Sequence, residues 1–203
     1  MPQGTTWYRR LADIPSIGYA GDDALRARLP ERDATPQVHR YEFEGKRTTS
    51  LSWSTPEGGT TASPAHRLGF SPSSEHASVR VRADVLAAIE LPGEPADYHF
   101  AMQSAAELLW KRRRGEPEHL AFVEWLSWLD VRLVEAHPEA FRSDPKRDEY
   151  FRILAFRRLV DLYETEGFLR DALLAAERFA RFQPSVDVAG LRARVGRLNA
   201  EDG

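Results

Sequence analysis

The densest cluster of charge in the chain is a run of four cations, Lys111, Arg112, Arg113 and Arg114. Such a run can bind the phosphates of a nucleic acid or the carboxylates of an acidic partner. It can equally complement the negative end of a helix and pair with the glutamates that follow it. We expect the structural role to dominate, and we keep the run as the candidate site for an anionic partner.

A second pair of cations, Arg80 and Arg82, lies in a segment where valine and arginine alternate. Alternation with a period of two is typical of a half-buried strand. We therefore predict a strand from His76 to Arg82, with both arginines on one face. That face is either an anion-binding surface or, as we prefer, an ordinary solvated face.

Motifs for catalysis, metal binding or cofactor binding are missing from the sequence. There is no cysteine, and the six histidines form neither an HxH nor an HExxH pair. The G-x-S-x-G, G-x-x-x-x-G-K-[ST] and G-x-G-x-x-G patterns are not found either. We consequently predict no catalytic, metal or cofactor residue, although a pair of carboxylates from distant positions stays open. Glu116, His119 and Glu124 lie close in sequence, but their spacing does not suit one face of a helix.

The charge balance argues against a dedicated nucleic-acid-binding protein. Lysine and arginine number 28 against 31 aspartates and glutamates, which gives a net charge of −3. The balance holds in both parts of the chain. Residues 1–95 have 11 basic and 12 acidic side chains, and residues 96–203 have 17 basic and 19 acidic side chains. Proteins of that class usually carry a basic excess, and no half of this chain does.

Composition divides the chain near residue 95. The first 95 residues hold 9 of the 13 prolines, 8 of the 13 glycines and 17 of the 22 serines and threonines. Proline and glycine interrupt helices, so a segment lean in both favours long helices. We predict an α+β protein, in which a small strand-containing or irregular module, 1–95, packs against an antiparallel helical-hairpin bundle, 96–203.

Apolar residues at helical spacing predict five helices in the second half. They run from Asp97 to Gly115, from Pro117 to His137, from about Lys146 to Glu166, from Leu169 to Pro184, and over Val188 to Leu198. The second is apolar nearly all round, so we expect it at the centre of the bundle. We expect its tryptophans to pack mainly in the core, and part of the aromatic belt to meet either the N-terminal half or a second protomer.

The first half is irregular, with a few predictable elements. Two strands, Val38 to Glu44 and Arg47 to Ser54, should form a hairpin around Gly45. Asp22-Asp23 is placed to cap a short helix that ends before Pro30. The segment from Pro56 to Ser74 is rich in turn residues, and we expect a loop there.

One stretch of the second half resembles a tetratricopeptide-type repeat, over about residues 153–184. The matching positions are Phe156, Leu159, Tyr163, Gly167, Leu169, Ala172, Leu173 and Pro184. A glycine there permits a tight turn, a small residue lets two helices approach, and a proline stops the second helix. The resemblance implies a binding scaffold whose groove holds a peptide or a helix of another protein.

The preferred functional hypothesis is a non-enzymatic adaptor that binds a protein or peptide, or a second copy of itself, through the helical half. The alternatives are a nucleic-acid-associated regulator that uses the basic residues, and an enzyme with residues 56–74 as its active-site loop. The sequence has no apolar run long enough for a membrane span and begins with no signal-peptide pattern. We therefore expect a cytoplasmic protein without membrane or cofactor.

Overall fold

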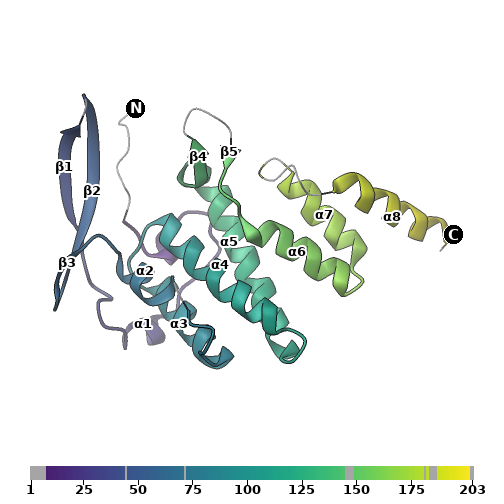
Figure 1. Ribbon diagram of the computed structural model, residues 1–203, viewed down its shortest axis with the longest axis horizontal. Helices are drawn as coiled ribbons and strands as arrows, with labels where there is room; N and C mark the ends of the chain where they lie inside the picture. Colours follow the sequence, from purple (N-terminus) through teal and green to yellow (C-terminus); the bar gives the residue numbers. More distant parts are fainter. Residues whose placement is uncertain are drawn as a thin grey trace.

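The computed structural model describes residues 8–43, 45–70, 72–144, 149–180, 182 and 187–201. It is an α+β fold, as predicted, with a small antiparallel sheet in the first half and packed helices after it (Figure 1). The strands are β1 (Gln37–Phe43), β2 (Lys46–Thr55), β3 (Gly58–Thr60), β4 (Arg142–Asp144) and β5 (Glu149–Tyr150). The α-helices are α1 (Asp23–Arg26), α2 (Pro64–Gly69), α3 (Ser78–Glu90), α4 (Pro95–Arg112), α5 (Leu120–Ala136), α6 (Leu154–Thr165), α7 (Leu169–Phe179) and α8 (Val188–Glu201), and 3-10 turns cover Leu11–Asp13, Pro117–His119 and Pro138–Phe141.

The predicted hairpin is present as β1 and β2, which pair in antiparallel register with Tyr41 opposite Thr48. Gly45 turns the chain in a left-handed conformation, with φ of +73°, which glycine adopts without a steric penalty. β3 pairs with the last residues of β2 and completes the sheet. Near the end of β2 that pairs with β3, Leu51 and Trp53 are buried. Trp53 packs edge-on against Tyr8, with 4.8 Å between the ring centroids.

The strand predicted from His76 to Arg82 is wrong, because Ser78 already begins α3. Its alternation is misleading, since the two valines differ in environment: Val79 is 75% exposed and Val81 is 1% exposed. Val81 belongs instead to a helical stripe that continues through Val85 and Ala88, at steps of four and three.

The loop predicted from Pro56 to Ser74 is also wrong, since β3 and α2 lie within it. Its turn residues mark the ends of a short helix: the Ser63 side chain accepts the His66 N–H, and Pro64 occupies the first turn. Gly69 closes α2 where it meets α3 and α4. A Cβ on Gly69 would lie 2.6 Å from the Cβ atoms of Ala88 and Ala101, so these helices cross too closely for any side chain there.

The predicted helices of the second half are found with shifted ends. α4 begins at Pro95 rather than after Asp97, and Asp97 lies in its first turn, where the carboxylate accepts the Glu94 N–H and the Ser63 hydroxyl. α5 follows a 3-10 turn, and α6 begins at Leu154, later than predicted, after β5. Lys146, the predicted start of that helix, and Pro184, the predicted end of the next, lie outside the described residues.

A tight turn joins α6 to α7. Gly167 has a φ of +83°, and the Phe168 N–H donates to the Tyr163 carbonyl at 2.7 Å, a bond that spans the end of α6. Ala172 is buried and lets α7 lie close to its neighbours. The geometry is that of a helical hairpin, and membership of the tetratricopeptide family stays a prediction.

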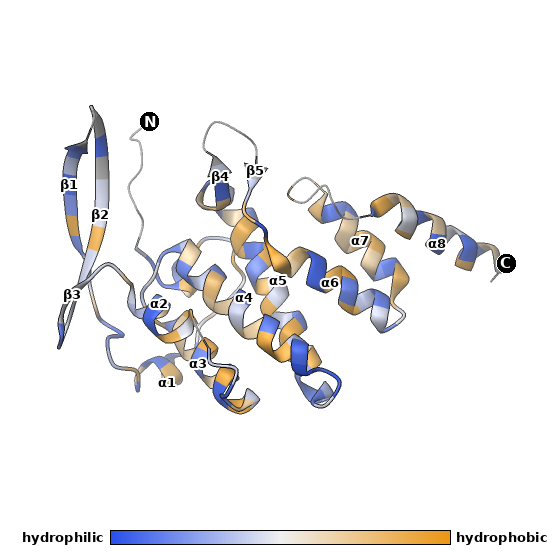
Figure 2. Ribbon diagram, in the orientation of Figure 1, coloured by the Kyte–Doolittle hydropathy of each residue, from blue (hydrophilic) through white to orange (hydrophobic). Residues whose placement is uncertain are grey.

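One apolar core runs through the helices. It extends from Leu11 to Leu191 and includes buried residues of α3, α4, α5, α6 and α7. Apolar positions gather along α5 and the helices beside it (Figure 2). The composition boundary at residue 95 coincides with the start of α4, inside this core, and the division into two modules stays a prediction.

The N-terminal segment is fastened across the helices by polar contacts. Arg9 and Gly93 exchange backbone hydrogen bonds at 3.1 and 3.2 Å. The hydroxyl of Tyr98, which is fully buried, lies between the carbonyls of Arg9 and Leu91. Among the described residues, no helix is long and apolar enough to cross a membrane.

Glu94, at the start of α4, should make stability depend on pH. Burial, together with the charge of Asp97, raises the pKa of Glu94 to about 7. The unfolded chain ionises this carboxyl at lower pH, so its contribution falls as pH rises from about 4.5 to about 7. We expect Glu94→Gln to be more stable than the wild type by about 1–2 kcal/mol at pH 8, and indistinguishable at pH 4.5, in urea unfolding. A difference that is equal at both pH values would contradict this prediction.

Candidate functional site

The predicted basic run lies at the C-terminal end of α4, where most of it holds the protein together. Lys111 pairs with Glu107 of the same helix at 2.8 Å. Arg112 donates to the carbonyls of Ser74 and His76 at 2.6 and 2.7 Å, and to the Ser78 hydroxyl at 2.9 Å. These bonds attach the segment before α3 to the end of α4.

The other two cations of the run differ from each other. Arg113 lies over the Trp110 ring, 4.1 Å from its centroid, and donates to the Trp110 carbonyl at 2.9 Å. Arg114 is exposed. Of the four cations predicted as an anion site, three therefore have contacts within the protein.

Arg80 and Arg82 do not share a face, contrary to the prediction. They stand two positions apart on α3, and residues at that spacing point to different sides of a helix. Arg80 pairs with Asp84 at 2.7 Å and is exposed. Arg82 lies over the Phe122 ring, 4.6 Å from its centroid, against α5.

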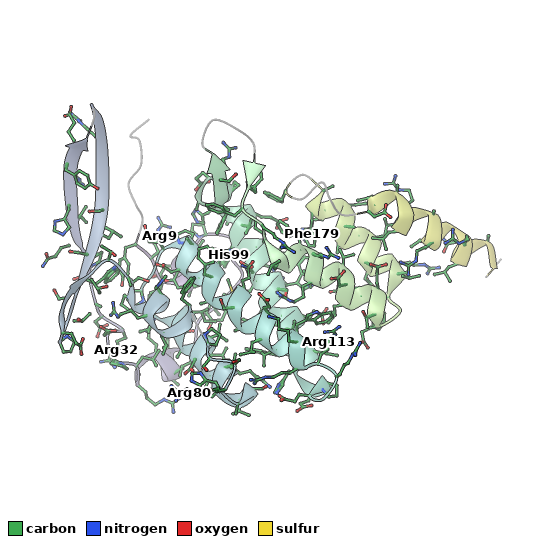
Figure 3. The ribbon with its side chains drawn as sticks, in the orientation of Figure 1. Arg9, Arg32, Arg80, His99, Arg113 and Phe179 are labelled. Carbon is green, nitrogen blue, oxygen red and sulfur yellow. The ribbon has the colours of Figure 1, made fainter. Side chains whose placement is uncertain are left out.

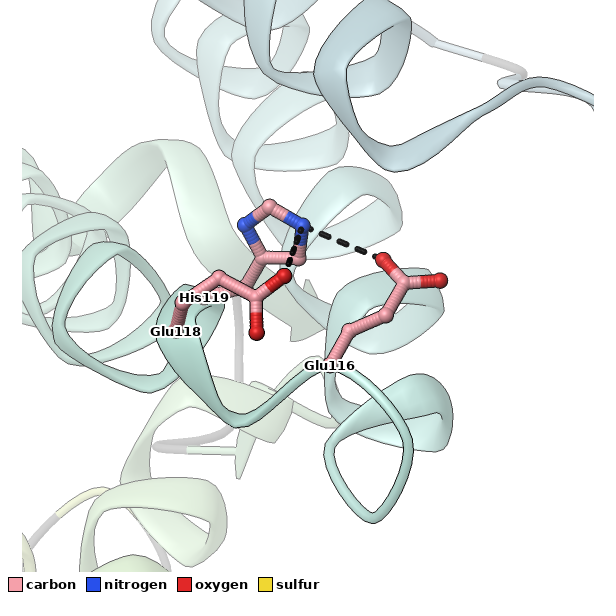
Figure 4. A group of neighbouring side chains, drawn as sticks. All are labelled: Glu116, Glu118 and His119. Carbon is pink, nitrogen blue, oxygen red and sulfur yellow. Dashed lines mark ion pairs between the residues drawn. The ribbon is translucent and has the colours of Figure 1, made fainter.

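A histidine and two glutamates meet just before α5 (Figure 4). His119 is buried, and its Nε2 atom lies 3.1 Å from Glu116 and 3.9 Å from Glu118. Its Nδ1 atom faces a donor, the Arg82 guanidinium, at 3.4 Å. Because Nδ1 then acts as the acceptor, the ring proton sits on Nε2 and points to Glu116. Each ring nitrogen of His119 thus has a partner within the protein, and one ligand atom from each of the three residues lies within 4.8 Å of the others, close enough to hold a metal ion together.

A polar cluster is buried between α4, α5 and α6. His99 and Asp130 are both 1% exposed, with 2.7 Å between Nδ1 and a carboxylate oxygen, and His99 lies within the helical layer (Figure 3). Burial lowers the pKa of His99, but the charge of Asp130 and its hydrogen bond outweigh burial and raise it above the ordinary value. Arg158 is buried nearby, where burial lowers its pKa against the attraction of Glu107 and Asp130. This cluster lies away from the surface.

The described surface is hollowed along one side of α5. An acidic hollow of about 440 Å³ is lined by Leu120, Ala121, Glu124, Leu162, Tyr163, Glu166, Phe168 and Asp171. An aromatic hollow of about 240 Å³ is lined by Gly18, Tyr19, Ala121, Glu124, Trp125, Trp128, Leu129 and Arg132. The two hollows share Ala121 and Glu124 and are therefore adjacent, and we call them together the α5 groove.

The floor of the α5 groove is a single stripe of α5. Ala121, Glu124, Trp125, Trp128 and Arg132 follow each other at steps of three, one, three and four, which keeps them on one side of the helix. The opposite side of α5 faces the core. A helix that is apolar nearly all round can thus bury one face and still line a groove with its tryptophans.

The walls come from two distant parts of the chain. The end of α6 and its turn into α7 supply Tyr163, Glu166 and Phe168, and Phe168 is more than half exposed. The Gly167 turn sets the place of Phe168, whose backbone bonds to Tyr163. Tyr19, from the N-terminal segment, forms the other wall.

A chain of hydrogen bonds fixes the centre of the groove. Trp128 Nε1 donates to the Tyr163 hydroxyl at 2.8 Å, and that hydroxyl donates to Glu124 at 2.5 Å. Burial and the bond to Glu124 raise the pKa of Tyr163 to about 12. Tyr163 consequently stays protonated at neutral pH and donates its hydroxyl proton to Glu124 at the junction of the hollows.

The Tyr19 wall is fixed from the opposite side. Its hydroxyl donates to Glu90, a buried carboxylate of α3 that also accepts the Asp22 N–H at 2.7 Å. Burial and this bond raise the pKa of Tyr19 well above its ordinary value. The Tyr19 ring stands 6.2 Å from Trp125, between centroids. Hydrogen bonds therefore hold a tyrosine in each wall of the groove, Tyr163 on one side and Tyr19 on the other.

Charge is distributed unevenly along the groove. Glu124, Glu166 and Asp171 line the acidic hollow, and Arg132 lines the far end of the aromatic hollow beside Gly18. Three carboxylates next to aromatic rings form a surface that attracts cations, both by charge and through the ring faces.

This groove was not predicted. The tryptophans and the helical hairpin are visible in the sequence, but the site joins residues 18–19, 120–132 and 162–171, which only the fold brings together. Glu124, considered with His119, points to the groove instead. Comparison with protein-family models, with curated proteins and with solved structures gives no match for this chain.

Proposed function

We propose that the protein is a non-enzymatic adaptor whose α5 groove binds a positively charged segment of a partner protein. The observation that carries the proposal is the acidic hollow, where Glu124, Glu166 and Asp171 surround a partly apolar depression. Phe168, in one wall of the groove, and Trp125, in its floor, are both exposed. Exposed aromatic residues beside a groove are typical of interaction sites.

The chemistry of the groove favours arginine or lysine as the anchoring residue. A guanidinium can stack on an aromatic ring while it donates to a carboxylate, and both interactions gain from partial burial. The protein uses this arrangement within itself, since Arg178 lies over the Trp128 ring and pairs with Glu135 at 2.6 Å. A partner's arginine in the groove would repeat that pattern against the accessible rings.

The alternative partners have less support. Nucleic acid would be repelled by the groove carboxylates, and most of the basic run at the end of α4 is engaged within the protein. An enzyme that uses residues 56–74 would have a third hollow available, of about 420 Å³, beside Phe70 and Ser74. The charged groups there are Glu107 and Lys111, which pair with each other.

The proposal can be tested with a fluorescein-labelled oligoarginine peptide as the probe, followed by anisotropy at low salt. We expect binding by the wild type and about tenfold weaker binding by the Glu166→Gln/Asp171→Asn variant. An oligoglutamate peptide of equal length should not bind.

A matched control separates the groove from net charge. Glu57→Gln/Glu75→Gln removes the same number of negative charges from exposed positions away from the groove. If both double variants weaken the peptide equally, long-range charge and not the groove is responsible, and the proposal fails. Binding that remains unchanged in the groove variant would overturn it as well.

A further inference from the structure

The β1–β2 hairpin extends away from the helices at one end of the molecule (Figure 1). Along β1, side chains on both faces are exposed: Val38 is 52% exposed and Tyr41, which points to the opposite face, is 50% exposed. Among the described side chains of the hairpin, the buried ones are Leu51 and Trp53, which lie at the end of β2 far from the turn. A two-stranded ribbon with two solvated faces is marginally stable on its own, so this hairpin lacks the neighbour that would complete it.

The outer edge of β1 is open, since β1 pairs with β2 alone among the described strands. Phe43 and Lys46 flank the two-residue turn and pair with each other, which makes theirs a hydrogen-bonded pair. The pattern alternates from there, so Arg40 and Glu42 direct their backbone N–H and C=O groups outwards. An open, exposed edge of this kind is a template for pairing with another strand.

We propose that the occupant of this edge is β1 of a second copy of the chain, paired antiparallel around a two-fold axis at Tyr41. In this register Arg40 of one copy lies opposite Glu42 of the other, and Glu42 lies opposite Arg40. Opposite charges directly across a strand pair stabilise it, and like charges destabilise it. The backbone groups that meet are those of Arg40 and Glu42, which point outwards in each copy.

Two further features agree with this register. Tyr41 meets its own copy, and pairs of aromatic residues across strands are favourable. Glu42 already lies opposite Arg47 within its own hairpin, so the second copy would place it between two arginines. Centring the axis on Arg40 instead would set Arg40 against Arg40, which the charges oppose. The proposal is independent of the α5 groove.

The test is a charge exchange read by sedimentation velocity. The wild type should dimerise with increasing concentration. Arg40→Glu leaves two acidic residues on the edge, and Glu42→Arg leaves two basic ones, so each variant alone should dimerise about tenfold or more weakly. An equimolar mixture of the two restores opposite charges at both contacts and should form a mixed dimer.

Controls keep the result interpretable. Glu42→Arg sets like charges opposite Arg47 within the hairpin, so the experiment is repeated with Glu42→Arg/Arg47→Glu, which keeps that internal pair opposite in charge. Circular dichroism checks that each variant folds. A wild type that stays monomeric at about 0.1 mM, or single variants that dimerise as well as it does, would overturn the proposal, as would a mixture that fails to associate.

Discussion

Replacing Asp130 by alanine should lower the free energy of unfolding by about 3–5 kcal/mol, the usual result of breaking a buried charge pair. Asp130 is the acceptor for His99 and contributes to the charge that balances Arg158, and all three are buried. Its loss leaves Arg158 a buried cation with less compensation. The measurement is urea unfolding at neutral pH.

The same variant should reverse the way in which the free energy of unfolding changes with pH near the pKa of His99. In the wild type Asp130 raises the pKa of His99, so the stability from this pair is complete below the unfolded pKa of about 6.5 and is lost as pH rises through the folded value. Without Asp130, burial alone acts on His99 and lowers its pKa, so stability should rise with pH over that range.

Asp130→Asn is the control for shape. It keeps an oxygen that can accept from His99 but removes the charge, so it should be less destabilising than alanine and should lose the fall in stability that the wild type shows as pH rises. An alanine variant within 1 kcal/mol of the wild type, with its pH profile unchanged, would show that the pair contributes little.

Phe179→Ala should also lower the free energy of unfolding by about 3–5 kcal/mol, because it opens a cavity in a packed aromatic cluster. Phe179 is fully buried at the end of α7, with its ring 4.6 Å from that of Phe156 and 5.7 Å from that of Trp128. Since Trp128 also donates to Tyr163, the cavity should loosen the floor of the α5 groove. Thermal and urea unfolding measure the loss, and the tryptophan emission should shift.

Leu174→Ala serves as the matched control. It removes a large apolar side chain from the same helix, but Leu174 is 65% exposed, so its loss should change stability by no more than about 0.5 kcal/mol. Equal effects at the two positions would contradict the packing described for α7.

The helices of the second half could be predicted because their apolar stripes have one period over many turns. α5, α6 and α7 each repeat that pattern, so the sequence alone distinguishes helix from strand without knowledge of the tertiary contacts. Their ends were harder, since Asp97 reads as a cap and is instead the residue that bonds back to Glu94 from inside the helix.

The first half was harder because short segments satisfy two patterns at once. Val79 and Val81 alternate with arginines, as in a strand, yet only Val81 reaches the core. Pro64 and Gly69 read as turn residues, and they are the two ends of α2. Which pattern applies depends on α4, against which both helices pack, and that contact is not visible in either segment.

The candidate site could not be predicted, for a similar reason. A basic run is visible in sequence, but its engagement depends on carbonyl groups such as those of Ser74 and His76, which lie far along the chain. The groove depends on Tyr19 and Phe168 meeting α5 from opposite sides. Neither residue has a sequence pattern that distinguishes it from other exposed aromatics.

The fastening of the N-terminal segment bears on the order in which the chain acquires its structure during synthesis. Arg9 bonds to Gly93 and Tyr98, and Tyr19 contacts Glu90 and Trp125. Each of these partners is synthesised more than 70 residues later in the chain. The contacts that hold Arg9 and Tyr19 can therefore form only after α3, α4 and α5 have been made. The Tyr19 wall of the α5 groove consequently cannot form before the floor on which it packs.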